Sequence, residues 1–170
     1  LAGAGIDAEQ IGAADLYSCF PIAVWVAMDA LGMTLDDLRP LTLTGGLPFF
    51  GGPGNNYSTH GIAEMVHWLR AQPEPAYGVV GANGGYLSKH AVGVYANMPA
   101  AFPEAVPEFK APEVVEVVAD PEPDGVIESY TFQPQKGGAR AVVVGRQLSD
   151  GRRWVGVADP EDAELLEWFE

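Results

Sequence analysis

Apolar positions along the first part of the chain alternate between the spacing of strands and the spacing of helices. The clearest helical pattern places Ile62, Met65, Val66 and Leu69 on one face. Strands are expected at 11–18, 40–44, 77–82 and 91–96, and helices at 20–31 and 57–70. This βαβαββ order predicts an α/β fold, in which helices pack on a layered sheet.

The pattern changes after the last of these strands. Prolines recur through residues 98–112, which predicts an extended and semi-rigid linker. Beyond the linker, apolar and polar residues alternate as they do in half-buried strands. The pairs Gly137-Gly138 and Asp150-Gly151 separate these runs and are typical of two-residue hairpin turns. The sequence therefore predicts an antiparallel sheet in the last third of the chain.

A helix is expected at the C-terminal end. Asp159 is the expected N-cap and Pro160 the expected first helical residue. We thus predict a first domain over 1–97 and a small antiparallel domain over 113–170, a meander or a barrel-like (OB-like) extension closed by this helix. A domain of this size is only marginally stable alone, so we expect it to dock on the first.

Charge and cysteine content narrow the classes of partner. The formal net charge of −14 argues against nucleic acid or an anionic membrane surface as partner. No apolar run approaches the roughly 20 residues that span a bilayer. Cys19 is the lone cysteine, which excludes an internal disulfide and suits a reducing cytoplasm. The chain begins at Leu1 without a signal-peptide pattern, so we expect a processed or truncated piece of a longer protein.

Three landmarks occur in order within the predicted first domain. Residues 42–65 read TLTGGLPFFGGPGNNYSTHGIAEM, with two glycine-rich turns ahead of a helix. YSCF occupies 17–20, and GANGGYLSKHAVGVY occupies 81–95. These segments resemble the thiolase superfamily, near the sterol-carrier-type thiolases. Residues 113–170 are similar to the small barrel-like extension of acetyl-CoA acetyltransferase-like members.

The resemblance carries expectations for fold, ligand and partner. It implies the C-terminal half of a thiolase fold plus an extension, with the N-terminal half on another chain or lost by truncation. A half-fold of this kind exposes a large apolar face. The resemblance also implies acyl-CoA or CoA as substrate or ligand, acyltransferase chemistry in lipid metabolism, and no separate cofactor or metal.

The chain departs from the family at its catalytic positions. The family's loop histidine falls on Gly52, and its second cysteine, an acid/base, falls on Gly81. The acidic residue of the second landmark falls on Ser18, and the amide or imidazole before it falls on Tyr17. The family's nucleophilic cysteine lies in the N-terminal half, so Cys19 is not that nucleophile. Ordinary thiolysis is therefore expected to be crippled, because it needs both an activated nucleophile and an acid/base.

The glycine-rich loop is the candidate ligand-binding segment. Gly51 and Gly52 allow backbone to approach a ligand, and the following helix N-terminus favours an anion. A thioester oxyanion or a CoA phosphate would fit there, with Asn55 as a further polar contact. A tight turn with Asn55 and Asn56 as helix caps explains the same residues equally well.

Four residues are candidates for chemistry: Tyr17, Asn56, Tyr57 and His90. The Asn56 amide can hold an oxyanion, and either tyrosine can donate a hydrogen bond or act as acid/base. The ordinary alternatives are a helix cap for Asn56 and half-buried aromatic packing for the tyrosines.

Lys89 and His90 are expected in a loop between two strands, near the active site that the resemblance implies. Lys89 can neutralise a CoA phosphate, and His90 can act as a base near neutral pH. A plain polar hairpin loop explains both, and is favoured.

The helix residues His60, Glu64 and His67 share one face, but an ordinary solvated face is favoured over a metal site.

Two functions follow from these observations. The first is an acyl-CoA-binding protein with impaired or altered carbon–carbon bond chemistry next to the thioester. The second is a non-catalytic binding or interaction module on a thiolase fold. Whether the chain is an enzyme stays open from the sequence, since one fold hosts many functions.

Overall fold

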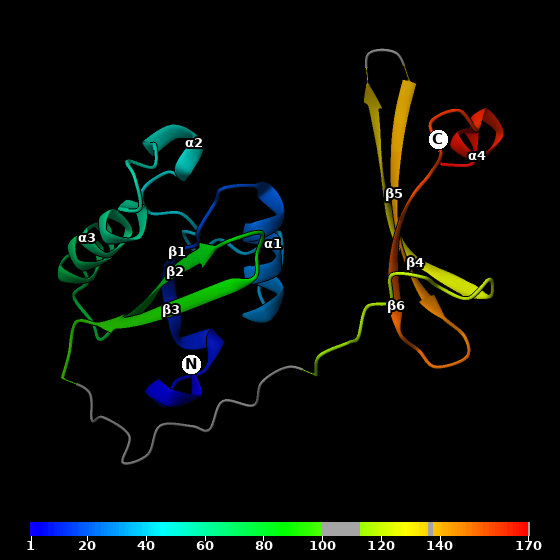
Figure 1. Cartoon of the computed structure of the whole chain (residues 1–170). Coiled ribbons are helices and arrows are strands. Elements are labelled where there is room, and N and C mark those ends of the chain that lie inside the picture. The colour runs from blue at the N-terminus through cyan, green and yellow to red at the C-terminus, as the bar shows by residue number, and fades with distance from the viewer. Residues whose placement is uncertain (100–112, 136–137, 170) are drawn as a thin grey trace. The chain divides into compact units, whose positions relative to one another are not determined.

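The computed structural model describes residues 1–99, 113–135 and 138–169. The chain forms two compact units, Leu1–Glu108 and Phe109–Glu170, and each is described by itself (Figure 1). Most of the predicted linker, residues 100–112, and Gly137 of one predicted hairpin turn lie outside the described residues. In the part of the chain that is described, no helix has the length and apolar character needed to cross a membrane.

A three-stranded sheet forms the centre of the first unit. Its order is β1 (Ile11–Asp15), β2 (Tyr77–Gly84) and β3 (Lys89–Ala96). β1 lies parallel to β2, whereas β2 and β3 form an antiparallel hairpin. The strands expected here are confirmed. The hairpin is longer than expected, because pairing continues to Gly84 and Lys89 on either side of a tight turn.

The strand expected at 40–44 does not form a ladder. A single bridge, between Asp15 and Thr42, joins this segment to β1. Pro40 has no N–H to donate, and the Thr44 N–H donates to the Asp15 side chain instead of to a neighbouring strand. The segment therefore follows β1 as irregular backbone, which corrects the prediction.

Two long helices cover opposite faces of this sheet (Figure 1). The helical segments of the unit are η1 (Ala2–Ala4), η2 (Ala8–Gln10), α1 (Pro21–Ala30), α2 (Leu47–Phe50) and α3 (Tyr57–Arg70). Met28 of α1 packs in one core with Val79, and Met65 of α3 packs in another with Val80. Successive strand residues point to opposite faces, which is why these two neighbouring valines meet different helices. The helices expected at 20–31 and 57–70 are confirmed.

The outer side of α1 is apolar and exposed. We call the exposed N-cap residue Phe20 and the exposed helix residues Ile22, Trp25 and Val26 the α1 outer face. Trp25 alone is 52% exposed, while Ala23 and Met28 on the inner side are buried. A helix that is apolar on all sides is normally buried on all sides. Within the described residues of the first unit, only the inner side of α1 is packed against other elements.

The second unit is an antiparallel sheet with one short helix. Its elements are β4 (Gly125–Gln135), β5 (Gly138–Gln147), β6 (Arg153–Val157) and α4 (Ala163–Glu167), with the strands in sequential order. Ala141, Val143, Ala158 and Phe169 form its buried core. The alternating pattern thus gives the antiparallel pairing that it predicts.

The terminal helix begins later than the sequence pattern predicts. Asp162 is its N-cap, and Oδ1 of Asp162 accepts a hydrogen bond from the Leu165 N–H at 2.9 Å. Asp159, the expected N-cap, accepts from the Glu161 N–H in the turn that precedes the helix. Both aspartates suit a cap, and the turn at 159–162 places the second one at the helix start.

Candidate functional site

A buried hydrogen-bond network fixes the start of the glycine-rich loop. Asp15 ends β1 and is 0% exposed. Its Oδ2 accepts from the Thr44 N–H at 2.8 Å and from the Thr44 hydroxyl at 2.9 Å. Because the Thr44 hydroxyl proton points to Asp15, the Tyr57 hydroxyl is the donor in the 2.7 Å contact with Thr44 Oγ1. The network therefore joins β1, the loop and the first residue of α3.

Ser18 supplies a second attachment for the loop. Its hydroxyl oxygen accepts a hydrogen bond from the Leu47 N–H at 2.9 Å. Gly46 has φ 91°, and a Cβ at this position would lie 3.1 Å from Ser18 Oγ. Glycine therefore satisfies both the backbone angle and the close approach. The short helix α2, which the sequence pattern does not predict, starts directly after this attachment.

The second half of the loop is exposed. Gly51, Gly52, Asn55 and Asn56 all lie at the surface, and Gly51 has φ 84°. Asn56 is in the N-cap position of α3, but its side chain makes no cap hydrogen bond. The Asn56 amide nitrogen instead lies 3.3 Å from His60 Nε2. These exposed amides and backbone groups are available to a ligand, whereas the first half of the loop is fixed internally.

Tyr57 is a buried positioning residue. It is 2% exposed, and its ring packs edge-on against Tyr17 with ring centroids 5.4 Å apart. Burial raises the pKa of the Tyr57 hydroxyl above its ordinary value of 10.0. A tyrosine with a raised pKa stays protonated at neutral pH, which suits its role as donor to Thr44. Its burial argues against the acid/base role considered for it from the sequence.

The raised pKa of Tyr57 predicts a specific loss of stability in alkali. Since the folded-state pKa lies above the unfolded value, this stabilisation is full below about pH 10 and is lost as pH rises through the folded pKa. Tyr57→Phe should therefore cost about 1 kcal/mol at neutral pH, and this difference should shrink above about pH 10. Urea unfolding at several pH values measures both effects. The exposed Tyr86→Phe is the control, and an equal pH profile in both variants would contradict the prediction.

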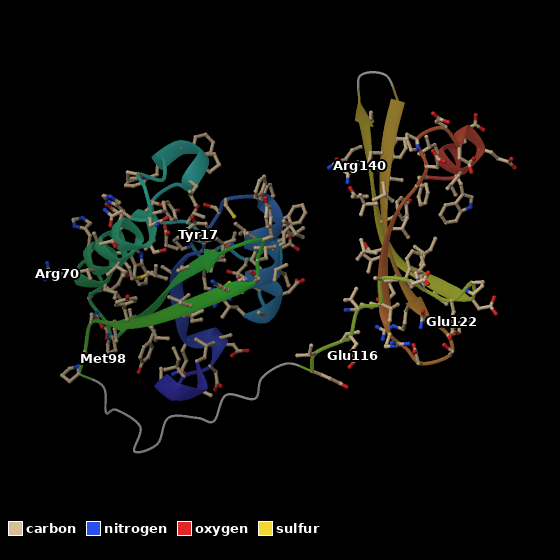
Figure 2. The ribbon with its side chains drawn as sticks, viewed as in Figure 1. Tyr17, Arg70, Met98, Glu116, Glu122 and Arg140 are labelled. Carbon is tan, nitrogen blue, oxygen red and sulfur yellow. The ribbon has the colours of Figure 1, made fainter. Side chains whose placement is uncertain are left out.

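An apolar cavity of about 250 Å³ lies between α1 and the β2–β3 hairpin. Alanine and valine side chains make most of its lining. Tyr17, labelled in Figure 2, lines it from the segment that joins β1 to α1. Gly81, Asn83 and His90 line it from the hairpin. Two predicted site residues, Tyr17 and His90, therefore share this cavity, and Tyr17 also contacts Tyr57 at the loop.

Lys89 and His90 begin β3 and do not lie in a loop, which corrects the expectation for them. His90 pairs with Asn83 and lines the cavity, and its Nε2 lies 3.0 Å from the Leu87 carbonyl oxygen. Neighbouring residues of a strand point to opposite faces, so Lys89 points away from His90. The structure thus does not bring these two side chains together at one site.

The sequence pattern does not identify three polar residues of the site: Asp15, Thr44 and Asn83. The sequence does carry one indication of Asp15, which is a carboxyl group at the end of the apolar strand IGAAD. The Asn83 side-chain amide donates to Cys19 Sγ at 3.6 Å, at the end of β2. Among the described residues, no group of three or more His, Cys, Asp or Glu is arranged to hold a metal ion.

Comparisons with known proteins agree on one superfamily. Residues 102–169 match the family described as thiolase-like protein type 1 additional C-terminal domain. A crystal structure of a monomeric SCP2-thiolase like protein type 1 from Mycobacterium smegmatis matches with 42% sequence identity and a TM-score of 0.76. That match covers 96% of this chain and 37% of the other protein, so the chain spans well under half of its length. A comparison with curated protein sequences gave no match.

Proposed function

Because this chain belongs to the thiolase superfamily, we propose that it binds an acyl-CoA thioester without catalysing ordinary thiolysis. The contact of Tyr17 with both candidate regions carries this proposal. Tyr17 packs on Tyr57 at the end of the glycine-rich loop and also lines the apolar cavity. A ligand with its polar part over the loop and its apolar part in the cavity would contact Tyr17 where the two parts meet. An acyl-CoA has a polar part and an apolar part of this kind.

The exposed half of the loop supports binding of the polar part. Gly51 and Gly52 present backbone without side chains, and Asn55 and Asn56 present amides that can donate to oxygen. The buried attachment of Thr44 to Asp15 fixes the start of the loop before the ligand arrives. Preorganisation of this kind improves affinity, because less conformational freedom is lost on binding.

The residues at the family's catalytic positions support binding without thiolysis. Gly52 and Gly81 stand where the resemblance places a histidine and a cysteine, and glycine has no group that can transfer a proton. Tyr57 is buried and keeps its proton. Tyr17 and His90 are the remaining candidates for an altered reaction at this site. Tyr17→Phe with no change in any acyl-CoA lyase assay would remove Tyr17 from that role.

The α1 outer face supports a partner for this unit. Its four apolar side chains are exposed in the chain described here. The chain spans 37% of the length of its structural relative. We propose that the N-terminal half of the superfamily fold, in the same protein or on another chain, covers this face in the natural protein.

The proposal predicts binding without turnover. Cleavage of acetoacetyl-CoA by CoA should be at least about 10²–10⁴-fold slower than with an active thiolase, because general acid–base catalysis contributes about that factor. The same sample should still bind both CoA compounds. Spectrophotometric loss of acetoacetyl-CoA measures the reaction, and an active thiolase in the same buffer is the positive control. Turnover at the rate of the control enzyme would contradict the proposal.

A further inference from the structure

Four valines gather on one side of the sheet in the second unit. Residues directly opposite each other on neighbouring strands share a side of the sheet. Two such pairs join β5 and β6, and we call their members the valine face: Val142 with Val157, and Val144 with Val155. Val143 lies between two of these valines on β5, so it points to the opposite side, where it packs in the core with Phe169.

The valine face is exposed. Val155 is 59% exposed and Val157 is 55% exposed, while the two valines of β5 are half-buried by their neighbours. Leu166 of α4 packs against the core on the other side of the sheet. An exposed apolar surface that polar residues border is typical of an interaction site. The next question is which chemistry borders the valines.

Arginines border the valine face at both ends. Arg140 precedes the valines on β5, and the cross-strand pair of Arg146 and Arg153 follows them. Glu128 accepts from Nε of both Arg146 and Arg153, at 2.6 Å in each case, so it neutralises one of these two charges. Arg140 points away from the side that carries α4 (Figure 2), and the described residues give it no ion pair. Each end therefore keeps one unbalanced positive charge, although the whole chain has a formal net charge of −14.

The spacing of these charges matches one kind of partner. Arg140 and Arg146 are six positions apart along β5, which is about 20 Å in a strand. A helix of about 14 residues has this length, and a helix is an ordinary second layer on a sheet. We infer that the valine face binds an amphipathic helix of another protein, with its apolar stripe on the valines and acidic residues at both ends. A basic helix would bury the same valines but would place like charges against the arginines.

A synthetic peptide tests this inference. The probe is a labelled helical peptide of about 14 residues, with leucines along one face and glutamates in its first and last turns. Fluorescence anisotropy with the natural protein should show saturable binding that weakens as salt is added, because salt screens exposed charges. The same peptide with lysines in place of the glutamates should bind at least about tenfold more weakly. Equal affinity for the two peptides, or no saturable binding at about 1 mM, would overturn the inference.

Two substitutions locate the binding surface. Val155→Asp puts a charge among the valines, and Arg140→Glu reverses the charge at one end. Each should weaken binding of the acidic peptide severalfold. The matched controls are Leu38→Asp and Arg70→Glu, which make the same changes at exposed positions of the first unit and should leave the affinity unchanged. Unchanged affinity in Val155→Asp would mean that the peptide binds elsewhere, and would overturn the inference.

Stability and oligomeric state distinguish the other possible occupants. Val155→Thr keeps the side-chain shape and should shift the midpoint of urea unfolding much less than Val143→Thr, because Val143 is only 7% exposed. An equal shift would show that another part of the natural protein already covers the valine face. A dimer of the natural protein that Val155→Asp dissociates would place a second copy there. Either result would overturn the inference.

Discussion

Replacement of Asp15 by alanine is expected to lower the free energy of unfolding by about 2–3 kcal/mol. The substitution leaves the Thr44 N–H and hydroxyl without their acceptor in a part-buried position. An unsatisfied buried donor costs about 1–3 kcal/mol. The loop also loses its side-chain attachment to β1, so affinity for CoA should fall together with stability. Urea unfolding and calorimetric titration measure the two effects.

Two further variants isolate the hydrogen-bond network. Asp29→Ala removes an exposed carboxyl group from α1 and should change stability by less than about 0.5 kcal/mol. Asp15→Asn keeps one acceptor oxygen for Thr44 and should lose much less stability than Asp15→Ala. The second oxygen of Asp15 has no hydrogen-bond partner within the described residues, so Asp15→Asn removes no other bond there. An Asp15→Ala protein as stable as Asp29→Ala would show that the network does not hold the loop.

Replacement of Trp25 by alanine is expected to destabilise the natural protein by about 3–5 kcal/mol. This figure applies to a tryptophan that is packed on all sides, as we propose for the α1 outer face. In the chain described here, Trp25 is 52% exposed, so its truncation inside this unit alone should matter much less. Thermal or urea unfolding of the natural protein measures the difference.

Leu38 is the matched control for Trp25. Its side chain is fully exposed and lies outside the α1 outer face. Leu38→Ala should change stability by less than about 0.5 kcal/mol in the natural protein. A similarly small effect of Trp25→Ala would mean that no second half of the fold covers α1. The proposal of a covering N-terminal half would then be wrong.

Periodicity predicts the regular parts of the first unit well. The apolar residues at 62, 65 and 69 identify α3 over the same residues that the structure gives, Tyr57–Arg70. Local pattern is less informative at 40–44, where a strand-like segment joins β1 through a single bridge and forms no ladder. Pro40 and the attachment of Thr44 to Asp15 explain why no strand forms at 40–44, and only Pro40 is visible in the local pattern.

The site is harder to predict because its contacts are distant in sequence. Thr44 lies 29 positions from Asp15 and 13 positions from Tyr57, so no local pattern connects them. Tyr57 stands next to exposed asparagines in the sequence, yet its hydroxyl points inward to Thr44. The cavity depends on small side chains from a helix and two strands, which only the folded structure brings together.

The position at which β3 begins determines whether the Lys89 and His90 side chains can approach the same ligand. A loop gives both side chains freedom to approach the same ligand. A strand that begins at Lys89 places them on opposite faces, and only His90 lines the cavity. The start of β3 cannot be read from the local alternation, because pairing with β2 across the turn extends the strand.

The most direct test of acyl-CoA binding is a calorimetric titration of the natural protein with CoA and acetyl-CoA. We expect saturable binding of both ligands, tighter for acetyl-CoA, and weaker binding of both by Asp15→Ala. Circular dichroism of the same sample establishes that the protein is folded. No saturable binding at about 1 mM ligand, in a folded sample, would contradict the proposed function. That result would favour an interaction module that retains the thiolase fold without its ligand.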